Sequence, residues 1–158
     1  MDNIRTLYGD VIARDLRVTI IASRFNDAIV ENLVRGAVDA LLRHGASEKQ
    51  IEIIRVPGAY DLPFVARRVA ASKRCDAIVA LGAVIRGATP HFDYVAGEAA
   101  RGIAGAAATA EIPVSFGVLT TDTIEQALER AGTKAGNKGA DAALCALELA
   151  NLLRRLES

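Results

Sequence analysis

The sequence predicts an α/β fold, a three-layer α/β/α sandwich built on a four-stranded parallel sheet. The first observation behind this prediction is that four apolar, partly β-branched runs recur along the chain, and each is typical of a buried strand. The second is that segments with helical spacing lie between these runs, so that strand and helix alternate throughout. Such alternation gives right-handed crossovers, which make the strands parallel and place helices on both faces of the sheet.

The length of 158 residues fits one domain, which we expect to span residues 1–158 with an N-terminal arm over residues 1–12. No internal repeat, linker or low-complexity segment divides the sequence. The strands are expected, in chain order, at residues 17–23, 51–56, 76–85 and 113–120. The arm contains NIRTLY at residues 3–8, which alternates only weakly between apolar and polar residues.

Five helices are expected between and after the strands, at residues 28–44, 61–74, 92–109, 123–131 and 137–156. The first has the clearest helical period, with a polar stripe opposite an apolar one, and Gly45 ends it. The third is rich in glycine and alanine, which indicates close packing on the sheet. The glycine-rich stretch GTKAGNKG separates the last two helices.

Composition excludes several kinds of protein. Nineteen basic and nineteen acidic residues balance, so the basic surface of a nucleic-acid-binding protein is missing. No apolar run is long enough to cross a membrane and the N-terminus lacks a signal-peptide core, so we expect a cytoplasmic protein without a membrane partner. Cys75 and Cys145 have neither CxxC spacing nor a nearby histidine, which predicts two buried free thiols and no metal site.

The least ordinary residues follow the predicted strands. SRFN follows the first strand, PGAYD the second and RGATPH the third, while Phe116 interrupts the fourth. In open parallel sheets, ligands bind beyond the carboxyl ends of the strands. The sequence therefore predicts a binding site at this end of the sheet.

The turn after the third strand has the composition of an anion site. Gly87 relaxes the backbone, Thr89 can cap the following helix, and Pro90 suits the first helical position. Free amides at a helix start attract phosphate, and the small residues let a phosphate approach the main chain. The alternative is an ordinary strand-to-helix turn.

His91 follows this turn and falls in the first turn of the predicted helix. An isolated histidine is more often a surface or core residue than a catalytic one. Its place beside the predicted phosphate turn favours proton transfer, because an imidazole can accept and return protons. His44 falls instead at a helix C-terminus before Gly45, and we interpret it as structural.

Aromatic and basic residues supply two further candidate groups. Phe25 and Phe116 are each more typical of a core, but at a ligand rim they can stack on a planar heterocycle. Arg130, Lys134 and Lys138 recur four residues apart near glycines. They can bind a phosphate, or they can form a solvated face balanced by nearby carboxylates.

Four sequence blocks resemble the 6,7-dimethyl-8-ribityllumazine synthase family. They are RFN at 24–26, VPGAYDLP at 56–63, GAVIRGATPHFDYV at 82–95 and FGVLTTDTIEQALERAGTKAGNKG at 116–139. The resemblance runs from about residue 17 to 153 and implies a flavodoxin-like fold. It also implies a transferase of riboflavin biosynthesis that condenses 5-amino-6-(D-ribitylamino)uracil with 3,4-dihydroxy-2-butanone 4-phosphate, releasing phosphate and water, without metal or organic cofactor.

The resemblance gives roles to the phosphate turn. His91 matches the family's general acid and base, beside the leaving phosphate. Ala88 and Thr89 match main-chain phosphate contacts, and Arg130 matches the phosphate-binding arginine. The implied reaction forms an imine between the uracil amine and the ketone, eliminates phosphate and then closes the ring.

The resemblance also implies where the pyrimidine binds. Phe25 matches the aromatic residue that stacks on the ring, and Phe116 matches a residue contributed by the neighbouring subunit. The remaining matches are the strand end that reads the pyrimidine edge (Ala83, Val84 and Ile85) and the loop that holds the ribityl-bearing substrate (Ala59, Tyr60 and Asp61).

Asp61 departs from the family pattern, which usually has glutamate at this position. Aspartate is one methylene shorter, so its reach toward the ribityl hydroxyls is smaller. We expect weaker binding of the ribityl chain than in a relative that carries glutamate.

The family forms pentamers, and in some members twelve pentamers make an icosahedral capsid. By this resemblance we expect a homo-oligomer, a pentamer or a 60-mer, in which residues 3–8 add a strand to a neighbouring subunit's sheet. The resemblance also makes riboflavin synthase a candidate partner. Two other functions remain open from the sequence, a flavin-binding module and a structural cage.

Overall fold

The computed structural model describes residues 3–158; residues 1 and 2, which begin the expected arm, lie outside the described part. A four-stranded parallel sheet forms the centre, with the strand order β2-β1-β3-β4. Its strands are β1 (Val18–Ser23), β2 (Ile51–Val56), β3 (Ala77–Ile85) and β4 (Val114–Thr121). The predicted strands are thus confirmed to within one residue at each end, and so is the predicted fold class.

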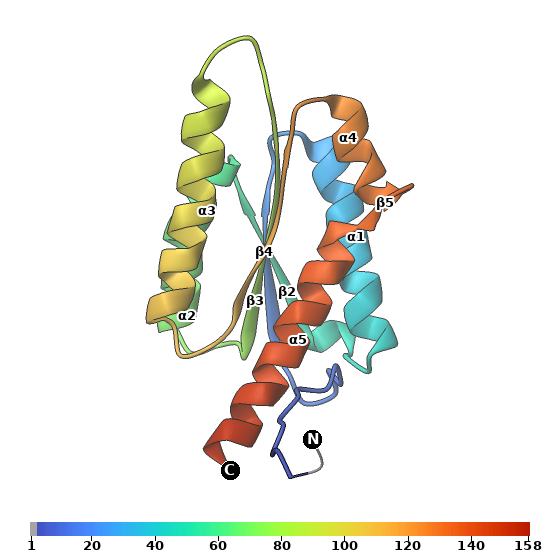
Figure 1. Cartoon of the computed structure of the whole chain (residues 1–158), viewed down its shortest axis with the longest axis vertical. Helices are drawn as coiled ribbons and strands as arrows, with labels where there is room; N and C mark the ends of the chain where they lie inside the picture. Colours follow the sequence, from blue (N-terminus) through green and yellow to red (C-terminus); the bar gives the residue numbers. More distant parts are fainter. Residues whose placement is uncertain (1–2) are drawn as a thin grey trace.

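Helices cover both faces of this sheet, as Figure 1 shows. The helices are α1 (Asp27–Arg43), α2 (Leu62–Ala71), α3 (His91–Thr109), α4 (Ile124–Glu129) and α5 (Lys138–Glu157). Two single 3₁₀ turns, η1 (Glu48–Gln50) and η2 (Ala59–Asp61), flank β2. Helices α1 and α5 pack together on one face of the sheet, and α2 and α3 pack together on the other.

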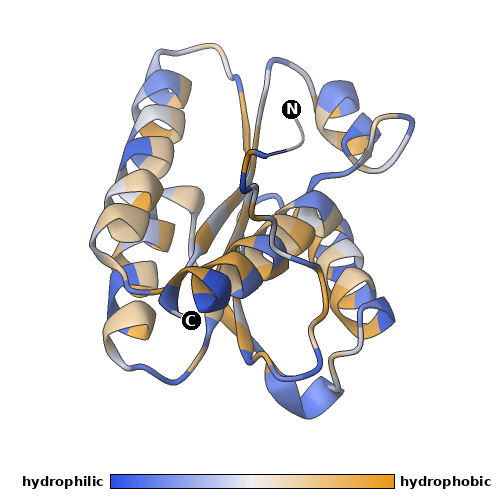
Figure 2. Ribbon diagram, turned by 60° about the horizontal axis from the view of Figure 1, so that its bottom comes forward, coloured by the Kyte–Doolittle hydropathy of each residue, from blue (hydrophilic) through white to orange (hydrophobic). Residues whose placement is uncertain are grey.

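Alternation of side chains along the strands divides the core into two layers. Residues such as Ile20 and Val79 face α1 and α5, whereas neighbours such as Ile21 and Ile78 face α2 and α3. Figure 2 shows apolar residues along the strands and the inner sides of the helices. Because both faces are covered, the central strands β1 and β3 read as almost continuous apolar runs.

The connection between the last two helices differs from the prediction. Residues Ala131–Thr133 (β5) and Gly136–Asn137 (β6) pair as a small antiparallel hairpin. Helix α4 therefore ends at Glu129, earlier than the predicted residue 131. Positive φ angles at Gly132 and Gly136, 103° and 77°, give the glycines of this stretch a conformational reason.

Both ends of the described chain lie at the bottom of Figure 1, where the strands begin. The last helix and the N-terminal segment are joined there, because the Asn151 amide donates to the carbonyls of Asp10 and Ile12. Residues 3–8 form no strand within this chain, and Ile4, Leu7 and Tyr8 are exposed. The strand addition to a neighbour stays a prediction.

Two smaller expectations are also answered. Cys75 is buried as predicted, and burial raises the pKa of its thiol, whereas Cys145 is exposed and the prediction for it is wrong. The reason is that Cys145 falls on the solvent-facing side of α5, whereas Ala143 and Ala146 fall on its buried side. No helix within residues 3–158 combines the length and apolarity that crossing a membrane requires.

Candidate active site

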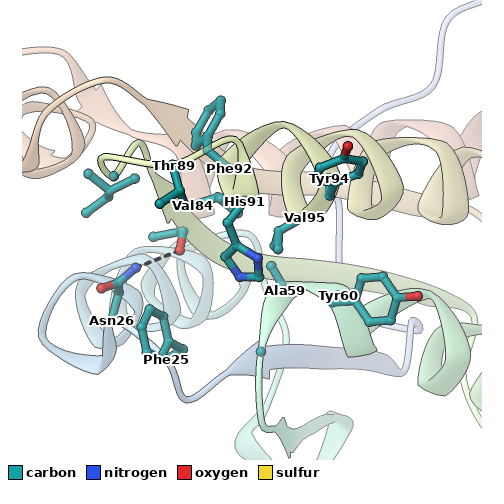
Figure 3. Close-up of a pocket in the computed structure, with 14 residues that line it drawn as sticks. Phe25, Asn26, Ala59, Tyr60, Val84, Thr89, His91, Phe92, Tyr94 and Val95 are labelled. Carbon is teal, nitrogen blue, oxygen red and sulfur yellow. Dashed lines mark hydrogen bonds between the residues drawn. The ribbon is translucent and has the colours of Figure 1, made fainter.

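A cavity of about 620 Å³ opens at the carboxyl end of the sheet, where the sequence predicts a binding site. Four segments line it: the β1–α1 connection, the loop after β2, the end of β3, and the start of α3 (Figure 3). The lining residues are Phe25, Asn26, Gly58, Ala59, Tyr60, Ala83, Val84, Ile85, Gly87, Thr89, His91, Phe92, Tyr94 and Val95. Of the twelve residues that the sequence proposes for the site, eight line this cavity: His91 and seven others.

The β1–α1 connection presents an aromatic ring to this cavity. Asn26 has φ 60° and ψ 41°, a left-handed conformation that asparagine adopts more readily than most residues. Its side-chain amide donates to the carbonyl of Ala83 at 2.9 Å, and the amide of Phe25 donates to the carbonyl of Pro57 at 3.1 Å. These hydrogen bonds attach the connection to two other segments, and Phe25 stays 72% exposed.

Sequence reasoning missed Asn26 as a site residue, although it belongs to the RFN block. The signal available was an asparagine directly before a helix, which is typical of a cap or a left-handed residue. Its side chain makes no capping hydrogen bond to α1. The side chain instead donates its hydrogen bond to the carbonyl of Ala83, near the end of β3.

The loop after β2 supplies Ala59 and Tyr60. Ala59 is buried at the cavity floor, while the Tyr60 ring is largely exposed. The amide of Gly58 donates to Oδ2 of Asp61 at 2.9 Å, which closes this loop on itself. Asp61 is half-buried and does not line the cavity. Because of the bond from Gly58, one oxygen of its carboxylate already has a backbone partner.

Helix α3 begins at His91, and its ring points toward the cavity beside Ala59 and Val95 (Figure 3). The prediction that Thr89 caps this helix is wrong, because the N-cap residue is Pro90 and no side-chain hydrogen bond caps the helix. The amide of Asp93 closes the first turn on the Pro90 carbonyl at 3.0 Å, so the helix starts one residue later. His91 therefore lies at the positive end of the helix dipole, next to an exposed turn.

The cavity walls are mainly apolar and aromatic. The residues Phe25, Tyr60 and Tyr94 are 72%, 61% and 74% exposed, which is unusual for three large aromatic residues around one cavity. Tyr94 was not singled out from the sequence. Exposed rings of this kind offer flat faces to a planar heterocycle, while His91 and Thr89 add polar groups at one side.

Four predicted site residues do not line this cavity in the single chain: Ala88, Asp61, Phe116 and Arg130. Ala88 is exposed in the turn itself. Phe116 lies within β4, as the sequence predicts, where it pairs with Ala80, whereas Thr120 and Thr121 form the carboxyl end of the strand. It is 46% exposed on the edge strand β4.

Arg130 lies at the end of α4, where its Nη1 donates to the carbonyl of Gln126 at 3.0 Å. Lys138 is paired with Asp141 at 3.1 Å. His44 is the C-cap residue of α1, with Nδ1 2.7 Å from the Ala40 carbonyl oxygen, as expected of a structural histidine. Among residues 3–158, no three histidine, cysteine or acidic side chains gather in a group that can hold a metal ion.

Comparisons with known proteins agree with this geometry. The family model for 6,7-dimethyl-8-ribityllumazine synthase matches residues 15–154. A relative from Chlorobium limicola named 6,7-dimethyl-8-ribityllumazine synthase is 57% identical over 152 residues, covering 96% of this chain and 98% of the relative. The match includes all the segments that line the cavity. The chain belongs to the 6,7-dimethyl-8-ribityllumazine synthase family.

Proposed function

We propose that this protein condenses 5-amino-6-(D-ribitylamino)uracil with 3,4-dihydroxy-2-butanone 4-phosphate to give 6,7-dimethyl-8-ribityllumazine, phosphate and water. The reaction is the penultimate step of riboflavin biosynthesis and uses neither metal nor organic cofactor. The observation that carries the proposal is one cavity that combines exposed aromatic rings with His91 at the first residue of α3. Family membership over nearly the whole chain supports it.

The pyrimidine binds between the aromatic rim and the end of β3. Phe25 stacks on the ring, and the exposure of its face in the free chain supports this role. The backbone at the β3 end reads the edge of the pyrimidine, and the loop after β2 holds the ribityl chain. These contacts fall on Ala83, Val84 and Ile85 and on Ala59, Tyr60 and Asp61, of which all but Asp61 line the cavity.

The butanone phosphate binds at the turn that precedes α3. The amides of Ala88 and Thr89 bind its phosphate at the positive end of the helix dipole, together with Arg130. Arg130 directly follows α4 and lies outside the cavity of its own chain. Its guanidinium reaches the phosphate either in a site completed by another subunit or after a side-chain movement.

His91 moves the protons that the condensation requires. The uracil 5-amine attacks the ketone carbon, and loss of water gives an imine. Elimination of phosphate then breaks the bond between carbon 4 and the ester oxygen, and attack by the ribityl-bearing nitrogen closes the ring with loss of a second water. Much of the acceleration comes from holding both reactants together, since a bimolecular step becomes effectively unimolecular.

A neighbouring subunit completes the site. Phe116 is half-exposed on the edge strand β4 and lies outside the cavity of its own chain, which fits a contact made across an interface. The exposed apolar residues of segment 3–8 support addition of this segment to a neighbour's sheet. The assembly is a pentamer or a capsid of twelve pentamers in the cytoplasm, with riboflavin synthase as a candidate partner.

The first test is to mix the purified protein with both substrates and follow lumazine formation by absorbance, with sedimentation velocity on the same sample. Formation well above the uncatalysed rate is expected, and the sedimentation coefficient distinguishes a pentamer from a capsid. Formation at the background rate by a folded assembly would contradict the proposal and favour a flavin-binding module.

The shared site has its own test, in which subunits carrying His91→Ala are co-assembled with subunits carrying Phe116→Ala. Each variant alone is expected to be poorly active. In a ring where each site joins one subunit to the next, random mixing restores intact residues at about a quarter of the sites. No recovery of activity after co-assembly would mean that both residues act within one chain.

A further inference from the structure

Arg86 joins three segments at the carboxyl end of the sheet. It is the first residue after β3, and its amide donates to the Thr121 carbonyl at 2.9 Å. Its Nε donates to Asp122 at 2.9 Å, in the connection between β4 and α4. Its Nη1 donates to Asp93 at 3.3 Å, in the first turn of α3. One side chain thus connects β3, α3 and the β4–α4 connection.

The guanidinium also covers a residue of the cavity. Its central carbon lies 4.2 Å from the centre of the Phe92 ring, within the range of a cation–π interaction. Phe92 follows His91 directly and lines the cavity. Arg86 therefore contacts the ring of the residue that directly follows His91 in the chain.

Two carboxylates compensate the charge of Arg86. The hydrogen bond to Asp122 raises the pKa of Arg86, and the Asp93 carboxylate raises it further, more than partial desolvation lowers it. Asp122 is itself oriented, because its backbone amide donates to the Gln126 side chain at 2.8 Å. Arg86 is the arginine nearest in sequence to the phosphate turn, yet its donors at Nε and Nη1 already have partners.

The turn between Arg86 and His91 depends on its two ends. Gly87, Ala88, Thr89 and Pro90 are all exposed, and no side chain caps the start of α3. Arg86 holds both ends of this turn, through its own backbone at β3 and through Phe92 and Asp93 on α3. A small displacement of the α3 start would move the turn amides and His91 together.

We infer that Arg86 is a positioning residue, which holds the phosphate turn and His91 in register with the end of β3 without binding the phosphate itself. The inference rests on the proposed function. Individual exposed ion pairs contribute little to stability, so the role follows from the three connected segments and not from the strength of any one pair.

The test compares Arg86→Gln and Arg86→Lys with the unsubstituted protein in steady-state kinetics. Arg86→Gln is expected to lower kcat by about tenfold and to raise the KM for the butanone phosphate, since misplacement by about 1 Å can cost up to about 100-fold. The KM for the pyrimidine should stay within about twofold, because its binding residues are held by other contacts. Lysine keeps the charge but lacks the planar guanidinium that binds two carboxylates at once. Arg86→Lys should therefore recover only part of the activity lost in Arg86→Gln.

Asp122→Asn separates positioning from direct phosphate binding. If Arg86 positions the turn, loss of its partner Asp122 should weaken binding of the butanone phosphate and raise its KM, as Arg86→Gln does. If Arg86 binds phosphate directly, Asp122→Asn frees the guanidinium and tightens inhibition by inorganic phosphate, which would overturn the inference. An Arg86→Gln protein with unchanged kcat and KM would overturn it as well.

Arg17→Gln is the matched control at the opposite end of the sheet. Arg17 pairs with Asp76 and has no contact with the cavity, so this variant should leave the kinetics unchanged in the folded protein. Turnover by the unsubstituted protein is measured in the same series. Its absence would count against the proposed function, whereas normal turnover with kinetically silent Arg86 variants would count against this inference alone.

Discussion

The two ends of the central sheet are built differently. At the amino end, polar side chains bind the backbone: Gln50 donates to the carbonyls of Arg14 and Leu16 at 2.7 and 2.9 Å. The Arg17 amide and both sides of its guanidinium fork donate to Asp76, across 59 residues of sequence. This end uses its polar groups to hold the N-terminal segment against the sheet.

At the carboxyl end of the same sheet, aromatic residues around the cavity are left exposed. Three aromatic rings around the cavity are exposed, and the Asn26 amide and Arg86 make its principal polar links between segments. Among the described residues, the Ser23 hydroxyl at the end of β1 is the buried side-chain atom without a hydrogen-bond partner. The contrast teaches that stability and recognition are assigned to opposite ends of one sheet.

Substitution of His91 should give the largest effect and test the recognition end. His91→Ala is expected to lower kcat by about 10²- to 10⁴-fold, the usual contribution of a general acid or base. The thermal midpoint should change little, because His91 is exposed. Activity is measured by lumazine absorbance and stability by calorimetry. A large fall in the thermal midpoint would show that this end also carries stability.

Gln50→Ala tests the stabilising end. It removes a side-chain amide from two strong backbone hydrogen bonds, so the free energy of unfolding should fall by about 1–3 kcal/mol. We expect kcat to stay unchanged, since Gln50 is far from the cavity lining. Urea unfolding gives the stability. Lys49→Ala, an exposed position in the same 3₁₀ turn, is the control and should change little.

Phe25→Leu tests the aromatic rim with a smaller change. Leucine stays apolar but has no flat face, so loss of about 1 kcal/mol of stacking should raise the KM for the pyrimidine roughly fivefold. Phe64→Leu is the matched control, because Phe64 is 65% exposed on α2 outside the cavity. Equal effects of the two variants on this KM would contradict the proposed stacking.

Asp76→Asn should give the smallest effect, visible in the pH dependence of stability. Burial alone raises the pKa of Asp76, but hydrogen bonds from the Arg17 side chain and backbone lower it more, so the net shift is downward. Its stabilising contribution is therefore present above the unfolded-state value of about 3.8 and is lost as the pH falls through the lower folded-state pKa. Urea midpoints at neutral and acidic pH should show a difference between the two proteins that shrinks in acid.

The sheet and its flanking helices could be predicted because their buried positions recur in the sequence with a recognisable spacing of apolar residues. Strands covered on both faces, such as β3, are unbroken apolar runs. In helices such as α1, apolar and polar residues alternate with the helical period. The β5–β6 hairpin could not be predicted in this way. Its strands have three and two residues within a glycine-rich stretch, too few for any period to appear.

The candidate site was predictable where a residue's role depends on its neighbours in sequence. His91 follows a turn of small residues, and Phe25 directly follows a strand, so both could be proposed from local context. Asn26 and Arg86 could not. Their contacts join residues 57 and 36 positions apart, and only the strand register brings those positions together.

The placement of the chain ends has a consequence for engineering. Both described ends lie where the strands begin, and Arg155, near the end of α5, donates to Asp10 of the N-terminal segment at 3.2 Å, so a linker at this end of the sheet can join them. New termini can then be opened between Lys134 and Ala135, at the exposed tip of the β5–β6 hairpin. Circular permutation is tolerated at exposed loop tips when the original ends are close. A permuted chain of this kind would keep every residue that lines the cavity on its own unbroken segment.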